Sequence, residues 1–462
     1  MTRQIGEKVK SFLNMQGGKA LCIVLLLVVV PSLYYGLALK AYGGTYSIYD
    51  EQTHMGYAWS VSHGEIPARG DLLPDEILDD LSCSGWRSIS DKIANTPNLP
   101  ACGADTSAEQ SLGAGEQYNY FHPPLYYAIT GFLARLVSML YSEISFAQAA
   151  RAVSVIWMVA GLLAMYAALR KWQVNFSCSL AVCSLVPYIP IFLNTGTAVT
   201  NDAPGLLCGA GMLWLAARFF REKNYHLLIP LIIVVFSCMI KGTFAFSIFA
   251  LCFILVLHGL IDFVKANQRR TAVKEMVAAC ACVFVALVCV FGWRFIQSHR
   301  GDASYVPAIT GTSTAPVEGL PIGEFLNTLM SSFDLSTSPG SLRGLDASVG
   351  YSGWLSLLQI VMLGAAFFLY FQNDGVCSHK LLVYSTIFGL LLSPALVQIM
   401  QYMGDRSMFV NVNIRYSIMM VPFVLCCWAL TVQNRKQPWI AWCVSGIGFI
   451  VCFVSVLGLA PL

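Results

Sequence analysis

The sequence predicts an all-α polytopic membrane protein with about eleven transmembrane helices. Of its residues, 56% are hydrophobic and 11% are charged, whereas a soluble domain carries about 25% charged residues. Uninterrupted apolar runs of about 20 residues recur along the chain, and that length crosses the roughly 30 Å of hydrocarbon in a bilayer. This composition lacks the polar surface of a soluble fold, so we expect the bilayer to be the main solvent of the protein.

The apolar runs delimit the expected spans. Residues 1–20 are polar and basic, and we expect them in the cytoplasm. The run that follows is too long for a signal peptide and has no small-residue cleavage pattern, so we expect an uncleaved first span. We expect no soluble domain before or after the membrane region. The expected spans are 21–40, 151–169, 177–195, 203–219, 226–243, 244–262, 276–296, 352–371, 381–400, 415–432 and 438–459.

The segment 124–141 is apolar and nearly long enough to span, but it carries Arg135 at its middle. If it lies in the interface, every Lys/Arg-rich connection falls on the side of the N-terminus, as the positive-inside rule requires. If 124–141 spans the membrane, Arg170/Lys171 and all later basic clusters lie on the opposite side from the N-terminus. We therefore predict an interfacial or re-entrant helix on the outer face. The basic clusters are Arg3/Lys8/Lys10/Lys19, Arg170/Lys171, Arg218/Arg221/Lys223, Lys265/Arg269/Arg270/Lys274 and Arg435/Lys436.

This topology divides the chain into alternating membrane and outer segments. The first outer loop, up to residue 123, contains twelve acidic residues against three basic ones, Arg69, Arg87 and Lys92. No internal repeat is visible. The expected segments are 1–20 (cytoplasmic), 21–40 (first helix), 41–150 (outer loop with interfacial helices), 151–296 (helices two to seven), 297–351 (second outer loop) and 352–462 (helices eight to eleven).

Sixteen cysteines do not form a metal-binding pattern here. Fourteen lie in apolar spans or at their cytoplasmic ends, where a free cysteine behaves as a small hydrophobe. Cys83 and Cys102 lie in the long polar loop. If that loop is outside the cell, a Cys83–Cys102 disulfide is expected there.

An acidic pair, Asp50–Glu51, follows the first span, and His54 shares a helix face with Asp50. Two adjacent carboxylates beside a membrane suit a general base with the group that orients it, or half of a metal site. An ordinary solvated loop would also contain such a pair, because acidic pairs are common.

Two further motifs stand at the same expected membrane level. His122 precedes two prolines, which hold it in an extended backbone, within the aromatic-rich segment 118–127. By itself that segment favours a lipid-anchoring aromatic girdle. Asn201 and Asp202 precede a span whose first turn contains proline, so they serve as helix caps, as functional residues or as both.

Three cations stand at the expected outer ends of spans: Lys241, Arg294 and Arg415, the last followed by Tyr416. Ionisable residues within a membrane are costly and usually functional. The alternative is snorkelling to the headgroups, which suits Arg294 better than Lys241. Together these cations suit the binding of a lipid phosphate.

The order of these motifs resembles the membrane glycosyltransferases of the C-type (GT-C) fold, which use polyprenyl-phosphate sugars. Protein O-mannosyltransferases and lipid A aminoarabinose transferases are members of that group. The resemblance covers about residues 20–430. It is carried by Asp50–Glu51, the His-Pro-Pro-Leu-x-Tyr segment from His122, Asn201–Asp202, Lys241-Gly-Thr and Arg415–Tyr416.

The resemblance implies a GT-C-like bundle and inverting sugar transfer by the catalytic pair Asp50–Glu51. Asp50, by preference, would accept the proton of an acceptor hydroxyl, while Lys241 and Arg415 would stabilise the departing polyprenyl phosphate. The other residues would orient acceptor and base, bind substrate or hold a metal. They are Glu51, His54, His122, Asn201, Asp202, Arg294 and Tyr416.

Two features depart from the family pattern. We expect no carboxy-terminal soluble domain, and no Asp-x-Asp motif stands in the first outer loop. Because the Asp-x-Asp motif is missing, the sequence does not predict an obligatory divalent metal, and we assign no cofactor.

Two other classes of function remain open. A transporter or flippase of a lipid-linked glycan would explain many spans, but it predicts charged positions deep inside them, and few are present. A scaffold with an acidic binding loop would recruit a basic partner. We expect a transferase in the bacterial plasma membrane, although the endoplasmic reticulum has the same sidedness. Its partners would be the lipid-linked donor and a glycan, lipid or protein acceptor, with no nucleic acid.

Overall fold

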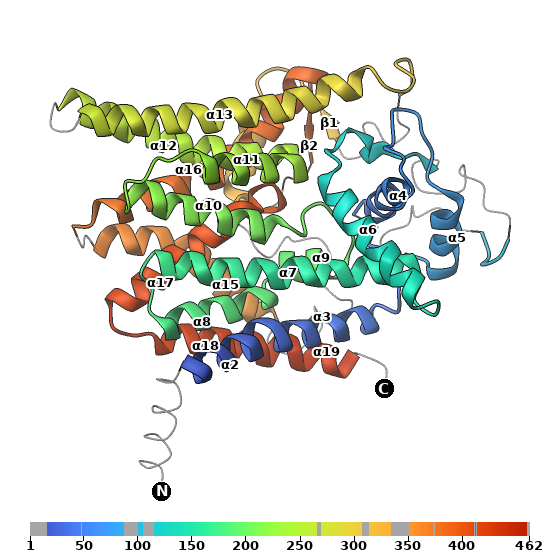
Figure 1. Cartoon of the computed structure of the whole chain (residues 1–462), viewed down its shortest axis with the longest axis horizontal. Coiled ribbons are helices and arrows are strands. Elements are labelled where there is room, and N and C mark those ends of the chain that lie inside the picture. The colour runs from blue at the N-terminus through green and yellow to red at the C-terminus, as the bar shows by residue number, and fades with distance from the viewer. Residues whose placement is uncertain are drawn as a thin grey trace, which may run out of the picture.

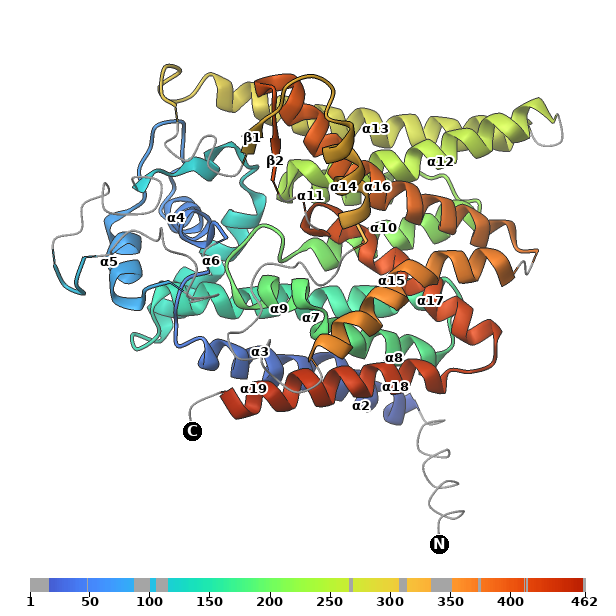
Figure 2. The same ribbon diagram turned by 180° about the vertical axis from the view of Figure 1, so that it is seen from behind.

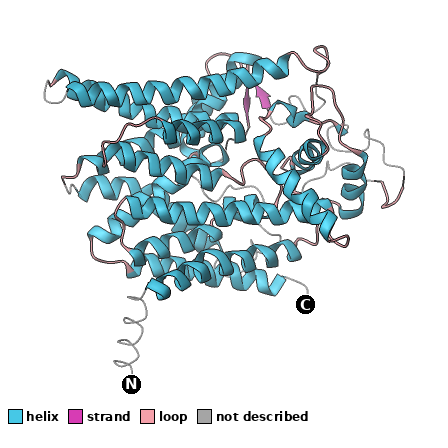
Figure 3. Cartoon of the chain, in the orientation of Figure 1, coloured by secondary structure: helices cyan, strands magenta, loops and turns pink. Residues whose placement is uncertain are grey.

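The structure, a computed structural model, is built almost entirely of helices (Figure 3). It describes residues 16–47, 49–86, 100–104, 115–265, 269–306, 314–333, 351–372, 375–410, 412 and 414–459. Within these ranges the only strands are β1 (Thr314–Pro316) and β2 (Ser407–Phe409), which pair antiparallel. The predicted all-α polytopic fold is confirmed. Arg3, Lys8, Lys10, Arg87 and Lys92 lie outside the described residues.

Long apolar helices lie side by side and form the body of the molecule (Figure 1). Seven helical segments among the described residues are long and apolar enough to cross a membrane. They are Gln16–Ala41 (α2 Gln16–Val24, η1 Leu25–Val29 and α3 Val30–Ala41), α7 (Phe146–Lys171), Gly242–Val264 (η6 Gly242–Phe244 and α12 Ala245–Val264), α13 (Arg269–Ser298), α15 (Tyr351–Gln372), α16 (Cys377–Asp405) and Arg415–Asn434 (most of η7 Ile414–Met420, then α17 Val421–Asn434).

The remaining expected spans are shorter or bent. The expected span 177–195 is a pair of helical segments, Phe176–Tyr188 and Pro190–Thr197, bent by 67°, where Pro190 interrupts the helix. Counted as one span, this pair raises the number of candidates to eight. Three expected spans are apolar helices of 10–17 residues, so a count of eleven stays a prediction. The elements concerned are α8 (Phe176–Leu185), η5 (Val186–Tyr188), α9 (Pro190–Thr197), α10 (Gly205–Phe220), α11 (Leu228–Ile240), α18 (Trp439–Gly448), η8 (Phe449–Phe453) and α19 (Val454–Leu459).

One end of the bundle carries three helices from the acidic first loop. These are α4 (Glu51–Ser62), α5 (Asp75–Ser84) and α6 (Leu125–Leu140), and α6 runs obliquely across that end (Figures 1 and 2). Arg135, which made 124–141 ambiguous in the sequence, donates a hydrogen bond to the Ser62 carbonyl at the end of α4. A Cβ at Gly131 would lie 2.0 Å from the Ala58 carbonyl oxygen, so glycine permits the close packing of α6 on α4. The position of α6 relative to a membrane stays a prediction.

The opposite end carries the basic turns. The turns from α7 to α8, α10 to α11 and α17 to α18 lie there, together with the end of α12 and the start of α13 (Figures 1 and 2). The acidic and basic ends are therefore separated by the length of the helices, as the sidedness of the charges predicted.

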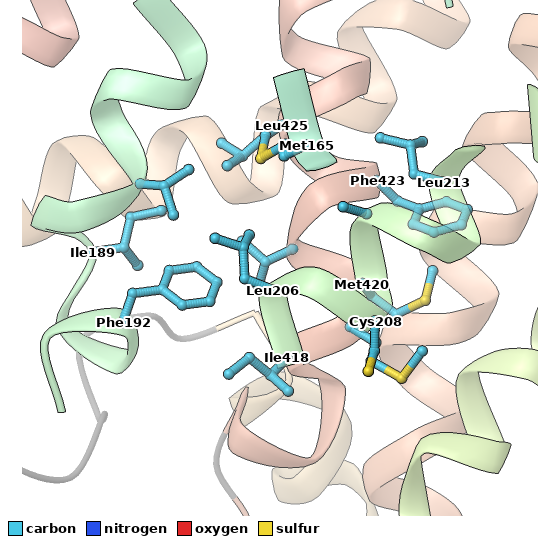
Figure 4. Packing of buried hydrophobic residues seen from close by; sticks show 14 of the residues in the cluster. Met165, Ile189, Phe192, Leu206, Cys208, Leu213, Ile418, Met420, Phe423 and Leu425 are labelled. Carbon is cyan, nitrogen blue, oxygen red and sulfur yellow. The ribbon is translucent and has the colours of Figure 1, made fainter. Parts of the chain in front are cut away.

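Buried apolar side chains from distant segments fill the space between these helices. Figure 4 shows Met165 of α7, Leu206 of α10 and Phe423 of α17 within one packed cluster. Gly209 allows η7 to approach α10, because a Cβ there would lie 2.5 Å from the Met419 carbonyl oxygen. This close contact brings the start of η7, with Arg415, towards the start of α10.

Candidate functional site

Asp50 and Glu51 occupy different backbone positions at the start of α4. Asp50 precedes the helix in the left-handed conformation, with a φ of 63°, which aspartate tolerates better than most residues. Glu51 is the first residue of the helix and is fully buried, whereas 29% of the Asp50 side chain is exposed. The two carboxylates therefore lie in different environments, although they are adjacent in sequence.

Glu51 is held by contacts within the protein. Its Oε1 accepts hydrogen bonds from Arg151 Nε at 2.8 Å and from the Val199 backbone at 3.0 Å. Its Oε2 accepts one from the Ser47 backbone. Oε1 thus ties the start of α4 to α7 and to the segment before α10, and Oε2 ties it to the chain that leads into Asp50.

Arg151 is a component of this site that the sequence analysis missed. It is 3% exposed, donates to the Gly44 carbonyl at 2.8 Å and lies 4.6 Å from the centroid of the Tyr46 ring. The sequence contains the relevant signal, which is an arginine at the beginning of a long apolar helix. Such a residue needs a partner in its interior position, and Glu51 is that partner.

Asp202, Lys241 and Arg415 come together as an ion cluster. Lys241 Nζ lies 2.6 Å from Asp202 Oδ1, and Arg415 Nε lies 2.9 Å from Asp202 Oδ2. Asp202 and Lys241 are 1% and 2% exposed, so this pair is buried. Lys241 Nζ also lies 5.8 Å from the centroid of the Tyr416 ring, within the range of a cation–π contact.

Arg415 connects this cluster to Asp50. Its Nη2 lies 3.4 Å from Asp50 Oδ2, and the Tyr118 hydroxyl donates to Asp50 Oδ1 at 2.9 Å. The charges therefore alternate along the row Asp50, Arg415, Asp202 and Lys241. We call these four residues the charged row.

Two histidines lie beside the charged row. The rings of His54 and His122 are stacked, with centroids 5.9 Å apart. Burial lowers the pKa of both well below its usual value, and the cationic charges of Arg415 and Lys241 add to the shift. Both rings are therefore neutral at pH 7.

The hydroxyl of Tyr127 connects His54 to Asn201. The Tyr127 hydroxyl lies 2.8 Å from His54 Nδ1 and accepts from Asn201 Nδ2 at 3.3 Å. A hydroxyl has one proton to donate and two lone pairs that accept, so this contact is compatible with either neutral tautomer of His54. His54 Nε2 and Asn201 Oδ1 are buried and have no hydrogen-bond partner within the described part of the chain. Tyr118 and Tyr127 belong to the segment that the sequence alone favoured as an aromatic girdle.

Arg294, which the sequence analysis grouped with Lys241 and Arg415, does not belong to the charged row. It lies on the exposed side of α13, between the exposed side chains of Phe291 and Phe295. Its neighbour Trp293 faces inward and donates to the Phe121 carbonyl at 3.0 Å.

The outer part of this end is joined by a disulfide between Cys83 and Cys102, whose Cα atoms lie 4.3 Å apart. The Tyr46 hydroxyl donates to Asp80 Oδ2 at 2.6 Å and so fastens α5 to the chain that leads into Asp50. Burial, followed by the charge of Asp80, raises the pKa of Tyr46.

The carboxylates that could serve a metal here are already in contact with cations. Arg151 neighbours Glu51, Lys241 and Arg415 neighbour Asp202, and Arg415 also neighbours Asp50. Among the described residues, the one group with the spacing of metal ligands lies elsewhere, on α12 and α13.

Residues 122–294 match the family model of the dolichyl-phosphate-mannose-protein mannosyltransferases. The match includes His122, Asp202 and Lys241 and supports the C-type glycosyltransferase superfamily that the sequence resembles. Among curated proteins, none matches the chain. The match and the apolar helices support a multi-pass membrane glycosyltransferase of the C type.

Proposed function

We propose that the protein transfers a sugar from a polyprenyl-phosphate donor to an acceptor hydroxyl, with inversion, on the extracytoplasmic face of a bacterial plasma membrane. The observation that carries the proposal is the charged row, in which the partly exposed carboxylate of Asp50 contacts Arg415, and Asp202 joins Arg415 to Lys241. The acceptor is a glycan, lipid or protein hydroxyl.

Asp50 is the proposed general base. It is the more exposed carboxylate of the charged row, at 29% against 1% for Asp202. The acceptor oxygen attacks the anomeric carbon while its proton passes to Asp50, and the bond from that carbon to the phosphate oxygen breaks. The electron pair of the broken bond leaves with the polyprenyl phosphate, and attack from the opposite face inverts the anomeric centre.

Arg415 and Lys241 are the proposed phosphate-binding cations. Arg415 has 19% of its side chain exposed and Lys241 has 3%, so Arg415 is placed to meet the lipid phosphate directly. Lys241 stabilises the same negative charge from behind, where burial strengthens its field. Asp202 holds both cations in position between reactions.

His54, His122 and Asn201 are proposed to orient the substrates. His54 Nε2 and Asn201 Oδ1 are buried without a hydrogen-bond partner among the described residues, so each can pair with a substrate group that donates or accepts a hydrogen bond. Sugar hydroxyls have both capacities, and an unpaired buried polar group gains most from such a partner. Tyr416 is proposed to take part in the same substrate binding, because its ring centroid lies 5.8 Å from Lys241 Nζ.

Glu51 is proposed as a positioning residue for Asp50. Its two oxygens already accept hydrogen bonds from Arg151, Val199 and Ser47. A carboxylate engaged in this way has little capacity to accept a substrate proton. Glu51 would therefore affect transfer indirectly, by holding the left-handed turn that positions Asp50.

The test is transfer of a labelled sugar from synthetic polyprenyl-phosphate donors by detergent-purified protein. We expect turnover in micelles, and we expect Asp50→Asn to lower it by about 10²–10⁴. The matched control is Asp75→Asn, which removes an exposed acid at the start of α5. Near-normal transfer by Asp50→Asn would contradict the role of the base. Flipping of a lipid-linked glycan in vesicles, without any transfer, would favour the transporter.

A further inference from the structure

A second group of ionisable side chains lies on α12 and α13, at the basic end of the bundle. It consists of His258 and Asp262 of α12 and Glu275 of α13. Helix α4, which follows Asp50 of the charged row, lies at the other end (Figure 1), so the proposed transfer makes no use of this group.

The packing of the two helices brings these residues together. His258 and Asp262 are four residues apart and therefore share one face of α12. Between them, Gly259 allows α13 to come close, because a Cβ there would lie 2.9 Å from Met276 Cγ and 3.2 Å from the Ala272 carbonyl oxygen. Glu275, next to Met276, is thereby placed against His258.

The distances fit ligands of one cation. His258 Nδ1 lies 2.9 Å from Glu275 Oε1 and 3.8 Å from Asp262 Oδ2, and one ligand atom from each residue lies within 4.8 Å of the others. Zinc binds nitrogen and oxygen at about 2.0–2.2 Å, which places tetrahedral ligands about 3.4 Å apart. The two measured distances lie on either side of that value.

The two carboxylates of the group face His258, and neither has a permanently charged partner among the described residues. Glu275 is fully buried, and its Oε2 has no hydrogen-bond partner among the residues that the structure describes. Within the same residues, neither Glu275 nor Asp262 forms an ion pair with lysine or arginine. A buried carboxylate without a cation is costly.

A fourth side chain faces the other nitrogen of the histidine. Cys377 Sγ, at the start of α16, lies 3.8 Å from His258 Nε2. A histidine that binds a metal through Nδ1 carries its proton on Nε2 and usually donates it to an acceptor. The sulfur of Cys377 occupies that acceptor position.

We propose that His258, Asp262 and Glu275 bind a divalent transition-metal ion, with zinc or manganese as the matching class. One imidazole and two carboxylates suit these ions better than Ca²⁺ or Mg²⁺, which prefer oxygen ligands alone. The bound ion joins α12 to α13. Its ligand His258 also contacts Cys377 at the start of α16.

The experiment titrates Co²⁺ into chelator-stripped protein that carries no polyhistidine tag. We expect one equivalent of Co²⁺ to bind with visible absorption bands, and Zn²⁺ but not Mg²⁺ to displace it. His258→Gln and Glu275→Gln should weaken binding at least about tenfold. The matched control, His226→Gln, removes an exposed histidine at the same end and should leave binding unchanged.

Absence of stoichiometric binding to the wild-type protein, or unchanged binding by His258→Gln, would overturn the proposal. If Glu275→Gln does not fold, Asp262→Asn decides, because its side chain is 37% exposed and tolerates the change. The readout is metal binding, so its failure would leave the proposed transfer untouched.

Discussion

Arg151 donates a hydrogen bond from its Nε to Glu51 Oε1 across 2.8 Å, although the two residues are 100 positions apart in the chain. Both side chains are buried, at 4% and 0% exposure. This pair fixes the first residue of α4 and therefore the turn that presents Asp50. Stability and the geometry of the proposed base thus depend on the same contact.

Breaking this buried pair should destabilise the protein. We expect Glu51→Gln and Arg151→Met each to lower the free energy of unfolding by about 3–5 kcal/mol, because each leaves a buried charge without its partner. The measurement is unfolding by sodium dodecyl sulfate in mixed micelles. The double variant should lose less than the sum of the two single losses. Additive losses would show that the two side chains do not stabilise each other.

Arg415 should matter for the transition state more than for donor binding. We expect Arg415→Met to lower kcat by about 10²–10³, the typical effect of removing one electrostatic donor. The measurement is kcat and KM for sugar transfer by purified protein. Arg406→Met is the matched control, because Arg406 is an exposed arginine at the same end of the bundle. A rise in KM with unchanged kcat would instead assign Arg415 to ground-state binding.

His54 should make the protein sensitive to acid. Its pKa in the folded protein is lowered by burial, while in the unfolded chain it is about 6.5. The unfolded state therefore binds the proton more readily, so stability is retained above about pH 6.5 and falls as the pH drops below it. His54→Gln should flatten the dependence of the unfolding midpoint between pH 7 and pH 5. Equal slopes for the variant and the wild-type protein would contradict the burial of a neutral His54.

The close approach of η7 to α10 should tolerate no added side chain. We expect Gly209→Ala to cost about 1–3 kcal/mol, because its Cβ would lie 2.5 Å from the Met419 carbonyl oxygen. Displacement of η7 would also move Arg415 and slow transfer. Gly292→Ala is the matched control, since no atom lies within 4 Å of a Cβ there. Equal stability of the two variants, measured by thermal unfolding, would contradict this account.

The sequence by itself determined the helical class and the approximate limits of the apolar helices. Each is a property of a local window: a run such as 352–371 is long and apolar whatever lies beside it, and the structure has a helix at Tyr351–Gln372. The separation of acidic and basic ends was also readable, because charge accumulates in the connections between such runs. For the same reason Asp50, Asp202, Lys241 and Arg415 could be singled out as polar residues at the ends of spans.

Only the tertiary structure decided how those residues meet. It turned Glu51 away from Asp50 and paired it with Arg151, left Arg294 on the exposed side of α13, and placed Arg415 between two carboxylates. Asp50 and Arg415 are 365 positions apart in the chain. Hydropathy is summed over neighbouring residues, whereas an ion pair depends on the distance between side chains that are remote in sequence, and packing of the helices sets that distance.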